Sequence, residues 1–256
     1  MDTAAIARLL CDVAADVVLP RWRSLAADEV VQKRPGDLVT VADREAEEAL
    51  TTALHAAFPD ALIVGEEASF ADGTTLTRLP EAAHAFVIDP VDGTRNFASG
   101  SPDFGVMLAE TRHGEAVRGW IWQPVHDALY VAERGGGVTR NGTPLAPVGR
   151  RAPWEVAGPR RFPGGGSAEL TFTWTHGACA IDYPLLLAGG VDALVYNTVH
   201  PWDHLAGTLM AREVGGEAQR IGGSRPWHAG GDGGQLLVAA EPAILRALTQ
   251  HAASLM

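Results

Sequence analysis

The apolar positions of this chain switch several times between helical and strand spacing. Apolar residues three or four positions apart predict an amphipathic helix over residues 3–27, bent or ended near Pro20. The same spacing predicts a second helix over residues 43–58, with Asp43 as its N-cap. Residues 30–42, between the two helices, predict a loop with two cations and then a short segment.

Short apolar runs bounded by turn residues predict strands in the next part of the chain. Buried strands are expected at residues 61–64 and 86–88, with a loop rich in Thr and Gly over residues 71–84 between them. Pro90 has no N–H to give to a strand ladder, so we expect the second strand to end there. Residues 104–131 have the pattern of antiparallel strands joined by turns.

A stretch rich in Pro and Gly over residues 147–168 predicts a long loop. It marks the expected boundary within one unit of residues 1–256, between an N-terminal lobe of about 1–146 and a C-terminal lobe of about 147–256. Helices alternate with strands around the antiparallel run, which predicts a layered α/β sandwich. The remaining predicted elements are strands at 170–174, 193–196 and 235–240, and helices at 177–187, 205–214 and 242–255.

Two carboxylates follow the predicted strand at residues 86–88. Asp89 and Asp92 point from a short loop toward one small volume, where they repel each other unless a cation or a proton lies between them. Mg²⁺ suits this pattern, because it binds carboxylates and carbonyls such as that of Val91, and Thr94 adds a hydroxyl. The alternative is a plain turn, since Asp-Pro and Asp-Gly are common turn dipeptides.

Acidic residues also follow two other predicted strands. Glu66 and Glu67 come directly after the strand at residues 61–64, and Asp203 precedes the helix predicted at 205–214. Taken singly, the glutamates are explained by a solvated turn and Asp203 by a helix N-cap. The three loops together offer the oxygen ligands of a hard cation.

Charge and cysteine content narrow the class of protein. The formal net charge is -11, so the basic surface that nucleic-acid binding requires is absent. The two cysteines, Cys11 and Cys179, are far apart in sequence and predict reduced thiols in a cytoplasmic protein. Neither a signal peptide nor a membrane span is predicted, because charged residues interrupt every apolar run of sufficient length.

The order of the acidic loops resembles the inositol monophosphatase family of Mg²⁺-dependent, lithium-sensitive phosphatases. The matching segments are GEE at residues 65–67, DPVDGTRNF at 89–97 and WDHLAG at 202–207, with DLVTVAD at 37–43 before them. The resemblance covers nearly the whole chain. It implies an α+β fold, the αβαβα sandwich of the sugar phosphatases, and a homodimer that hydrolyses a small phosphorylated metabolite.

The resemblance also implies roles for individual residues. Two or three Mg²⁺ ions, with Mn²⁺ able to substitute, would be bound by Glu66, Asp89, Asp92, Asp203 and the carbonyl of Val91. Thr94 and Asp43 would orient and deprotonate the attacking water, with Glu67 acting from behind the ligands. Gly93 and Thr94 would donate backbone N–H groups to the phosphate.

The residues that contact the substrate depart from the inositol-specific pattern. Tyr196 stands where those members have Glu, and Gly177, Ala178 and Cys179 replace a GTA-type segment. Arg95 adds a cation next to the phosphate position. Histidinol phosphate, fructose 1,6-bisphosphate and 3′-phosphoadenosine 5′-phosphate are therefore alternative substrates. An alternative of another class is a regulatory protein that binds a metal or metabolite without turnover.

Overall fold

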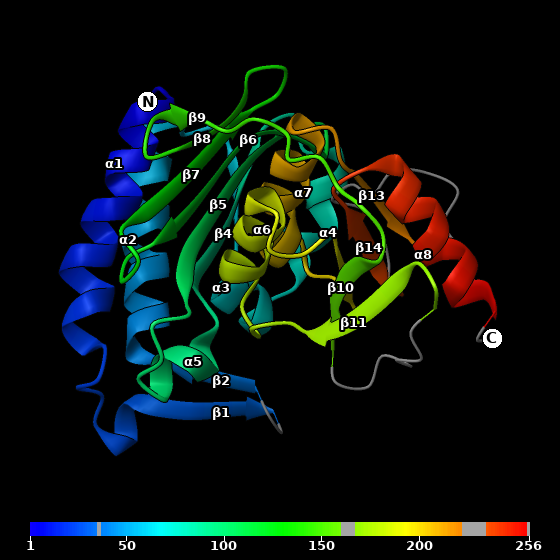
Figure 1. The fold of residues 1–256 in the computed structure, drawn as a ribbon. Coiled ribbons are helices and arrows are strands. Elements are labelled where there is room, and N and C mark those ends of the chain that lie inside the picture. Colours follow the sequence, from blue (N-terminus) through cyan, green and yellow to red (C-terminus); the bar gives the residue numbers. More distant parts are fainter. Residues whose placement is uncertain (35–36, 160–166, 222–233, 255–256) are drawn as a thin grey trace.

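The computed structural model describes residues 1–34, 37–159, 167–221 and 234–254, which form five layers (Figure 1). Helices α1 (Thr3–Val13) and α2 (Val41–Ala57) form the first layer. A seven-stranded sheet, the helices α6 (Cys179–Ala188) and α7 (Pro201–Glu213), a five-stranded sheet and α8 (Pro242–Ser254) follow in that order (Figure 1). The predicted αβαβα sandwich is confirmed.

The larger sheet is antiparallel except at one edge. Its first two strands are parallel, with Val64 opposite Val87, and all later neighbours are antiparallel. The antiparallel strands predicted within residues 104–131 are confirmed. In spatial order the strands are β3 (Leu62–Gly65), β4 (Ala85–Asp92), β5 (Gly105–Arg112), β6 (Glu115–Gln123), β7 (Ala128–Glu133), β8 (Gly137–Arg140) and β9 (Thr143–Pro144).

Side chains that alternate along these strands supply two separate cores. On β4, Phe86 and Ile88 pack with α1 and α2, whereas Val87 joins the core on the other side, around α6 and α7. The same alternation places Leu108 of β5 in the first core and Met107 in the second. Both faces of the sheet are therefore dry, which fixes the strand register and holds the ends of β3 and β4 side by side.

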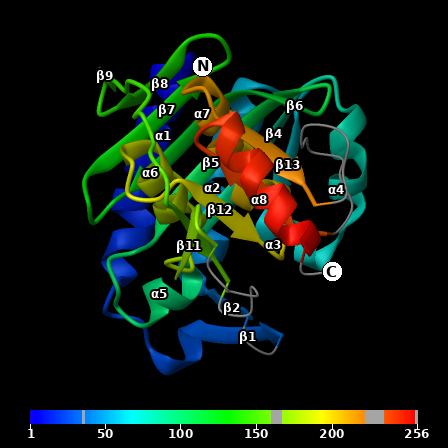
Figure 2. The same ribbon diagram turned by 45° about the vertical axis from the view of Figure 1, so that its right-hand side comes forward.

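The smaller sheet has the spatial order β11, β10, β12, β14, β13. Figure 2 labels three of these strands, β11, β12 and β13, with α8 beside them. Two of its strands differ from the sequence-based expectation. The strand β10 lies inside the stretch predicted as a long loop, because its five residues stand among prolines and glycines. The strand β13 was not predicted, because only one of its four residues is apolar. The strands are β10 (Trp154–Gly158), β11 (Leu170–Trp174), β12 (Ala193–Tyr196), β13 (Glu217–Arg220) and β14 (Leu236–Ala239).

The N-terminal region corrects three expectations. The first helix ends at Val13 and continues as a π-helical turn, Ala14–Val18, and a 3-10 turn, Leu19–Arg21. The predicted loop before the second helix is a hairpin of β1 (Val30–Arg34) and β2 (Asp37–Thr40). Thr40, not Asp43, is the N-cap of α2, and Asp43 accepts from the Thr40 N–H in a capping box.

The segments that carry acidic residues also differ from the prediction. Residues 71–84, predicted as a loop, contain α4 (Thr74–Arg78) and a 3-10 turn, Leu79–Glu81, and they follow α3 (Glu66–Ala71). The strand β4 does not end at Pro90 but runs to Asp92, with an irregular register between Asp89 and Asp92. A bulge of this kind lets a strand accommodate Pro without losing a ladder bond.

The start of α7 is the last correction. The helix begins at Pro201, so Asp203 lies in its first turn, and His200 occupies the N-cap position without a side-chain cap. The helix N-cap that was the alternative explanation for Asp203 is therefore excluded. Among the described residues, no helix is long and apolar enough to span a membrane. The two-lobe division remains a prediction, although the larger sheet ends at Pro144 and the smaller one begins at Trp154.

Candidate active site

Three predicted metal ligands meet where β4 and α7 approach each other. Carboxylate oxygens of Asp89, Asp92 and Asp203 all lie within 4.8 Å of one another. Asp89 and Asp92 are almost completely buried, because β4 is covered on both faces along its whole length. The backbone N–H of Ala180, at the start of α6, donates to Asp92 Oδ2 at 2.6 Å and fixes this carboxylate.

The buried acids perturb one another strongly. Burial raises the pKa of Asp92 to about 6 and that of Glu66 to about 8. Burial, followed by the neighbouring negative charges, also raises the pKa of Asp89 and of Asp203 well above the usual range of a carboxyl group. These four carboxyl groups cannot all be ionised without a large electrostatic cost. A bound cation removes this cost, because its positive charge stabilises the ionised carboxylates.

The donor set fits a hard divalent cation. Asp89 Oδ1 is buried and has no hydrogen-bond partner, so a ligating oxygen is available without breaking an existing bond. The Val91 carbonyl accepts from Thr94 Oγ1 at 3.0 Å and retains a second lone pair. Oxygen ligands of this kind are those that Mg²⁺ prefers.

Glu66 and Glu67 open α3 and are held by Lys33 of β1. Lys33 Nζ lies 3.0 Å from Glu66 Oε1 and 2.5 Å from Glu67 Oε1. The lysine side chain is only 10% exposed, so this pair of bonds lies away from water. This pairing could not be predicted from the sequence, where Lys33 is a cation in a predicted loop and lies 34 residues from Glu67.

Glu47 of α2 is a residue that our prediction from the sequence missed. Its carboxylate accepts from the N–H groups of Glu67 and Ala68, both at 2.8 Å, and so caps α3 from a neighbouring helix. A signal was present, because Glu47 lies four residues after Asp43 and three before Leu50 on the buried face of α2. A carboxylate on an apolar helix face needs hydrogen-bond donors. Here the donors are the backbone N–H groups after Glu66, so the contact positions the GEE segment of residues 65–67.

The Glu47 contact explains why residue 65 is Gly. A Cβ atom at Gly65 would lie 2.2 Å from the Glu47 carboxyl carbon, which no real Cβ tolerates. We expect Gly65→Ala to displace α3 and Glu66, and to lower apparent Mg²⁺ affinity by about 10- to 100-fold, as loss of a supporting contact does at other metal sites. Titration calorimetry with Mg²⁺ measures this.

The matched control for Gly65→Ala is Gly149→Ala, because a Cβ at Gly149 has nothing within 4 Å. The control is expected to bind Mg²⁺ as the natural protein does. Equal Mg²⁺ affinity in both variants would show that α3 does not need the Glu47 contact to present Glu66.

Thr94 connects Asp43 to the acid cluster. Its hydroxyl lies 3.1 Å from Asp43 Oδ1 and 3.0 Å from the Val91 carbonyl oxygen, and its single proton donates to one of these two acceptors at a time. Thr40 donates its N–H to Asp43 Oδ2 at 2.8 Å and its hydroxyl to the same atom, which leaves Oδ1 for Thr94. The predicted pairing of Thr94 with Asp43 is present.

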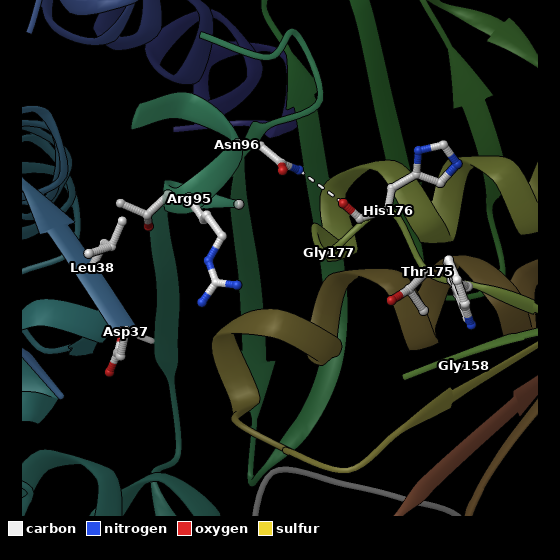
Figure 3. Close-up of a pocket in the computed structure, with 11 residues that line it drawn as sticks. Asp37, Leu38, Arg95, Asn96, Gly158, Thr175, His176 and Gly177 are labelled. Carbon is white, nitrogen blue, oxygen red and sulfur yellow. Dashed lines mark hydrogen bonds between the residues drawn. The ribbon is translucent and has the colours of Figure 1, made fainter. Parts of the chain in front are cut away.

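Gly93, the N-cap of α5 (Thr94–Ala98), lets the start of this helix fit between two other segments. Its φ of +82° is left-handed, and a Cβ here would lie 2.8 Å from Ala178 Cβ and 3.1 Å from the Asp103 carbonyl. Asn96 holds the same segments, because its amide group donates to the carbonyls of Asp103 and His176 at 2.7 and 3.0 Å, the second of which is drawn in Figure 3. The start of α5 is thereby fixed against residues 176–178.

Two cavities flank this junction. The first, of about 630 Å³, contains Gly93, Thr94, Arg95 and Gly177, four of the predicted substrate contacts (Figure 3). The second, of about 310 Å³, is lined by the other three predicted substrate contacts, Ala178, Cys179 and Tyr196. Three carboxylates, those of Asp92, Asp182 and Asp203, also line it.

Asp182 of α6 is the second residue that our prediction from the sequence missed. It is almost fully buried, its Oδ1 accepts from the His176 N–H at 2.8 Å, and its Oδ2 has no hydrogen-bond partner. Burial raises the pKa of Asp182 to about 7. Together with Asp92 and Asp203 it makes the second cavity acidic, and its only signal was an acid inside an apolar helix.

An aromatic group forms another wall of the second cavity. Tyr196 stacks on Tyr183, with ring centroids 5.8 Å apart, and lies 4.6 Å from the ring of His204. His204 Nε2 lies 3.0 Å from the Thr198 carbonyl, which only accepts, so this nitrogen carries the proton. Burial lowers the pKa of His204 to about 4, so the imidazole is neutral.

Comparison with known proteins agrees with the site. The model of the inositol monophosphatase family matches residues 2–255. The inositol-1-monophosphatase of Rhizobium meliloti is 32% identical over 86% of this chain and 89% of its own. The Nus factor SuhB of Pseudomonas aeruginosa is 30% identical over 82% of each chain.

The fold has the same relatives. A solved Thermotoga maritima IMPase superposes with a TM-score of 0.78 at 24% identity, covering 96% of this chain and 94% of that one. At this identity the likeness concerns the fold, and the whole-chain family match carries the assignment. The chain therefore belongs to the inositol monophosphatase family, whose members are phosphoric monoester hydrolases.

Proposed function

We propose that this protein is a Mg²⁺-dependent phosphomonoesterase that uses water to hydrolyse a small phosphorylated metabolite. One observation supports it above all. The cluster of Asp89, Asp92 and Asp203 is closely packed, Asp89 and Asp92 are buried, and the carboxyl groups have raised pKa values unless a cation is bound. Keeping such charges together costs stability, which is typical of a functional site.

The proposed metal ligands are Glu66, Asp89, Asp92, Asp203 and the Val91 carbonyl. When bound, Mg²⁺ would supply positive charge that neutralises phosphate oxygens and acidifies the attacking water. The site has more carboxylates than a single Mg²⁺ ion needs as ligands, and two or three bound ions would account for the surplus. Lys33 and Glu47 would position these ligands without binding the metal. Lys33 holds the Glu66 carboxylate, and Glu47 holds the start of α3.

The attacking water is assigned to Thr94 and Asp43. When Thr94 Oγ1 donates to Asp43 Oδ1, a lone pair on Oγ1 is free to accept a hydrogen bond from the attacking water and to orient it. As the water attacks, its proton would pass to Thr94 Oγ1 while the Thr94 proton passes to the Asp43 carboxylate. Burial raises the pKa of Asp43, which makes the carboxylate a better base. Glu67, which pairs with Lys33, is proposed to position the metal ligands without binding the metal itself. The N–H groups of Gly93 and Thr94 would bind the phosphate.

Phosphate release tests this proposal. In a panel of inositol 1-phosphate, histidinol phosphate, fructose 1,6-bisphosphate and 3′-phosphoadenosine 5′-phosphate, we expect release from at least one ester with Mg²⁺. EDTA should abolish release, Mn²⁺ should partly restore it, and Li⁺ should inhibit it. Absence of release from every ester, in protein that binds Mg²⁺ by calorimetry, would favour the non-catalytic alternative.

That second candidate has one specific observation behind it. Relatives 28–30% identical to this chain carry the name Nus factor SuhB, which does not name a phosphatase. The presence of the Thr94–Asp43 pair beside the acid cluster favours turnover, because a binding protein does not need it. A homodimer and a cytoplasmic location remain predictions, which size-exclusion chromatography with light scattering and cell fractionation would test.

A further inference from the structure

A third cavity, of about 660 Å³, lies between α2, α3 and the hairpin of β1 and β2. Its size is typical of a site for a small molecule. Among the described residues that line it there is no predicted metal ligand and no predicted substrate contact. We propose that this cavity is a regulatory site for a free amino acid with an apolar side chain, and that its occupation strengthens Mg²⁺ binding at the acid cluster. The regulatory part of this inference rests on the proposed function.

The residues that position the GEE segment also line this cavity. They are Lys33, Glu47 and Glu67. Lys33 pairs with the carboxylates of Glu66 and Glu67, and Glu47 accepts from the N–H groups of Glu67 and Ala68. A molecule in the cavity would therefore touch the contacts that hold Glu66, a proposed metal ligand, without occupying the metal site.

Two charged side chains of the cavity are available to a ligand. Arg44 and Glu48 are exposed one turn apart on α2, and within the part of the chain that the structure describes neither forms a hydrogen bond or an ion pair. The other charged groups that line the cavity are already paired, Lys33 with Glu67, or hydrogen-bonded, as Glu47 is. One cation and one anion remain. They suit a zwitterion whose carboxylate binds the guanidinium of Arg44 and whose ammonium group binds the carboxylate of Glu48.

The apolar part of the cavity would receive the side chain of the amino acid. Val39 of β2, together with Phe70 and Ala71 of α3, lines this part. Lys33 Nζ lies 4.3 Å from the centroid of the Phe70 ring, so a side chain packed on Phe70 would also exclude water from Lys33. The pairing of Lys33 with its carboxylates strengthens when water is excluded, because the effective dielectric constant falls.

The expected consequence is a higher affinity for Mg²⁺. A Glu66 carboxylate that Lys33 holds more firmly loses less freedom when it binds the ion. Because the coupling between two sites is reciprocal, Mg²⁺ and the amino acid should each raise the affinity of the other by the same factor, about 5- to 10-fold.

Calorimetric titration of the full chain with three probes tests the ligand class. L-phenylalanine carries both charges, 3-phenylpropionate lacks the ammonium group, and 2-phenylethylamine lacks the carboxylate. We expect L-phenylalanine to bind about 3- to 10-fold more tightly than either of the others, since each charge forms one exposed charge-assisted bond. Equal or tighter binding of 3-phenylpropionate would overturn the amino-acid assignment in favour of a simple anion. Absence of binding by all three probes would overturn the site.

Three substitutions assign the cavity. Arg44→Met and Glu48→Gln should each weaken binding of L-phenylalanine by about 3- to 10-fold. Ala71→Trp places a large ring in the cavity and should abolish binding. Arg8→Met is the matched control, because Arg8 is exposed on α1 and does not line the cavity. Undiminished binding in Ala71→Trp would place the probe elsewhere and overturn the site. Circular dichroism should be unchanged, since all four side chains are exposed.

Mg²⁺ titrations with and without saturating L-phenylalanine test the regulation. The dissociation constant of Mg²⁺ should fall about 5- to 10-fold in the natural protein. Ala71→Trp should lose this response to L-phenylalanine. A Mg²⁺ affinity that L-phenylalanine leaves unchanged in the natural protein would overturn the regulatory inference and leave the phosphatase function standing. Absence of Mg²⁺ binding under every condition would instead overturn the proposed function, whereas titration of L-phenylalanine in EDTA would still test the cavity.

Discussion

Asp92→Asn is expected to lower kcat/KM for phosphate release by about 1000-fold or more, the scale of losing one preorganised electrostatic group at a reacting centre. The Asn side chain retains an oxygen that can accept from the Ala180 N–H, so the hydrogen bond at 2.6 Å need not be lost. What disappears is a negative charge that lies within 4.8 Å of the carboxylates of Asp89 and Asp203. Kinetics across Mg²⁺ concentrations measure the effect.

The same substitution should stabilise the metal-free protein. Burial raises the pKa of Asp92 to about 6, above its unfolded value, so ionised Asp92 opposes folding at pH 8. Asn removes this opposition, and the free energy of unfolding in EDTA should rise by up to about 3 kcal/mol. Activity that falls while stability rises cannot be explained by misfolding.

Asp127→Asn is the matched control for Asp92→Asn. Asp127 is exposed in the turn between β6 and β7, with a φ of 49° that Asn adopts readily. It should change neither kinetics nor metal-free stability. Full Mg²⁺-dependent phosphate release by Asp92→Asn would falsify the assignment of this loop to the active site.

Mg²⁺ should raise the melting temperature by about 5–10 °C at 100 times its dissociation constant, since ligand binding to the folded state alone stabilises it. The increase should be larger at pH 8 than at pH 5. Burial raises the pKa of Asp92 to about 6 and that of Glu66 to about 8, both above their unfolded values. Their protonated forms therefore favour folding at low pH, and this stability is lost as pH rises through 6 to 8.

Thermal melts at pH 5, 6, 7 and 8, in EDTA and in Mg²⁺, measure this effect. In EDTA the melting temperature should fall across this range, and Mg²⁺ should offset the fall, because its charge replaces the lost protons. Asp92→Asn should weaken both the fall and the response to Mg²⁺. A Mg²⁺ response that is the same at every pH would mean that the ion binds outside the acid cluster.

Much of the fold was predictable because local patterns agree with the tertiary structure. Along the strands within residues 104–131, successive side chains enter the two cores in turn, as Met107 and Leu108 do. The two-residue spacing of the sequence pattern therefore matches the burial of the side chains. The errors fall where local rules meet a tertiary constraint. Pro90 normally ends a strand, but here the bulge between Asp89 and Asp92 absorbs it.

The helix caps show the same limit. Asp43 and Asp203 both have the composition of N-caps, yet the first lies at the third position of α2 and the second in the first turn of α7. A cap is decided by one residue's φ and ψ, and adjacent Ser, Thr or Asp residues compete for it. Sequence alone therefore places such residues near a helix start but does not choose among them.

The acid loops that predict a metal-dependent phosphatase could be found without coordinates, because the candidate ligands and their order lie within short contiguous motifs around Asp89, Glu66 and Asp203. The residues that support and surround these acids became visible only in the folded protein. Lys33 meets Glu67 across 34 residues, and Asn96 meets His176 across 80, and no local spacing encodes such pairs. The cavity that Arg95 lines exists because β2, α5 and the ends of β10 and β11 converge, and these segments are far apart in the sequence.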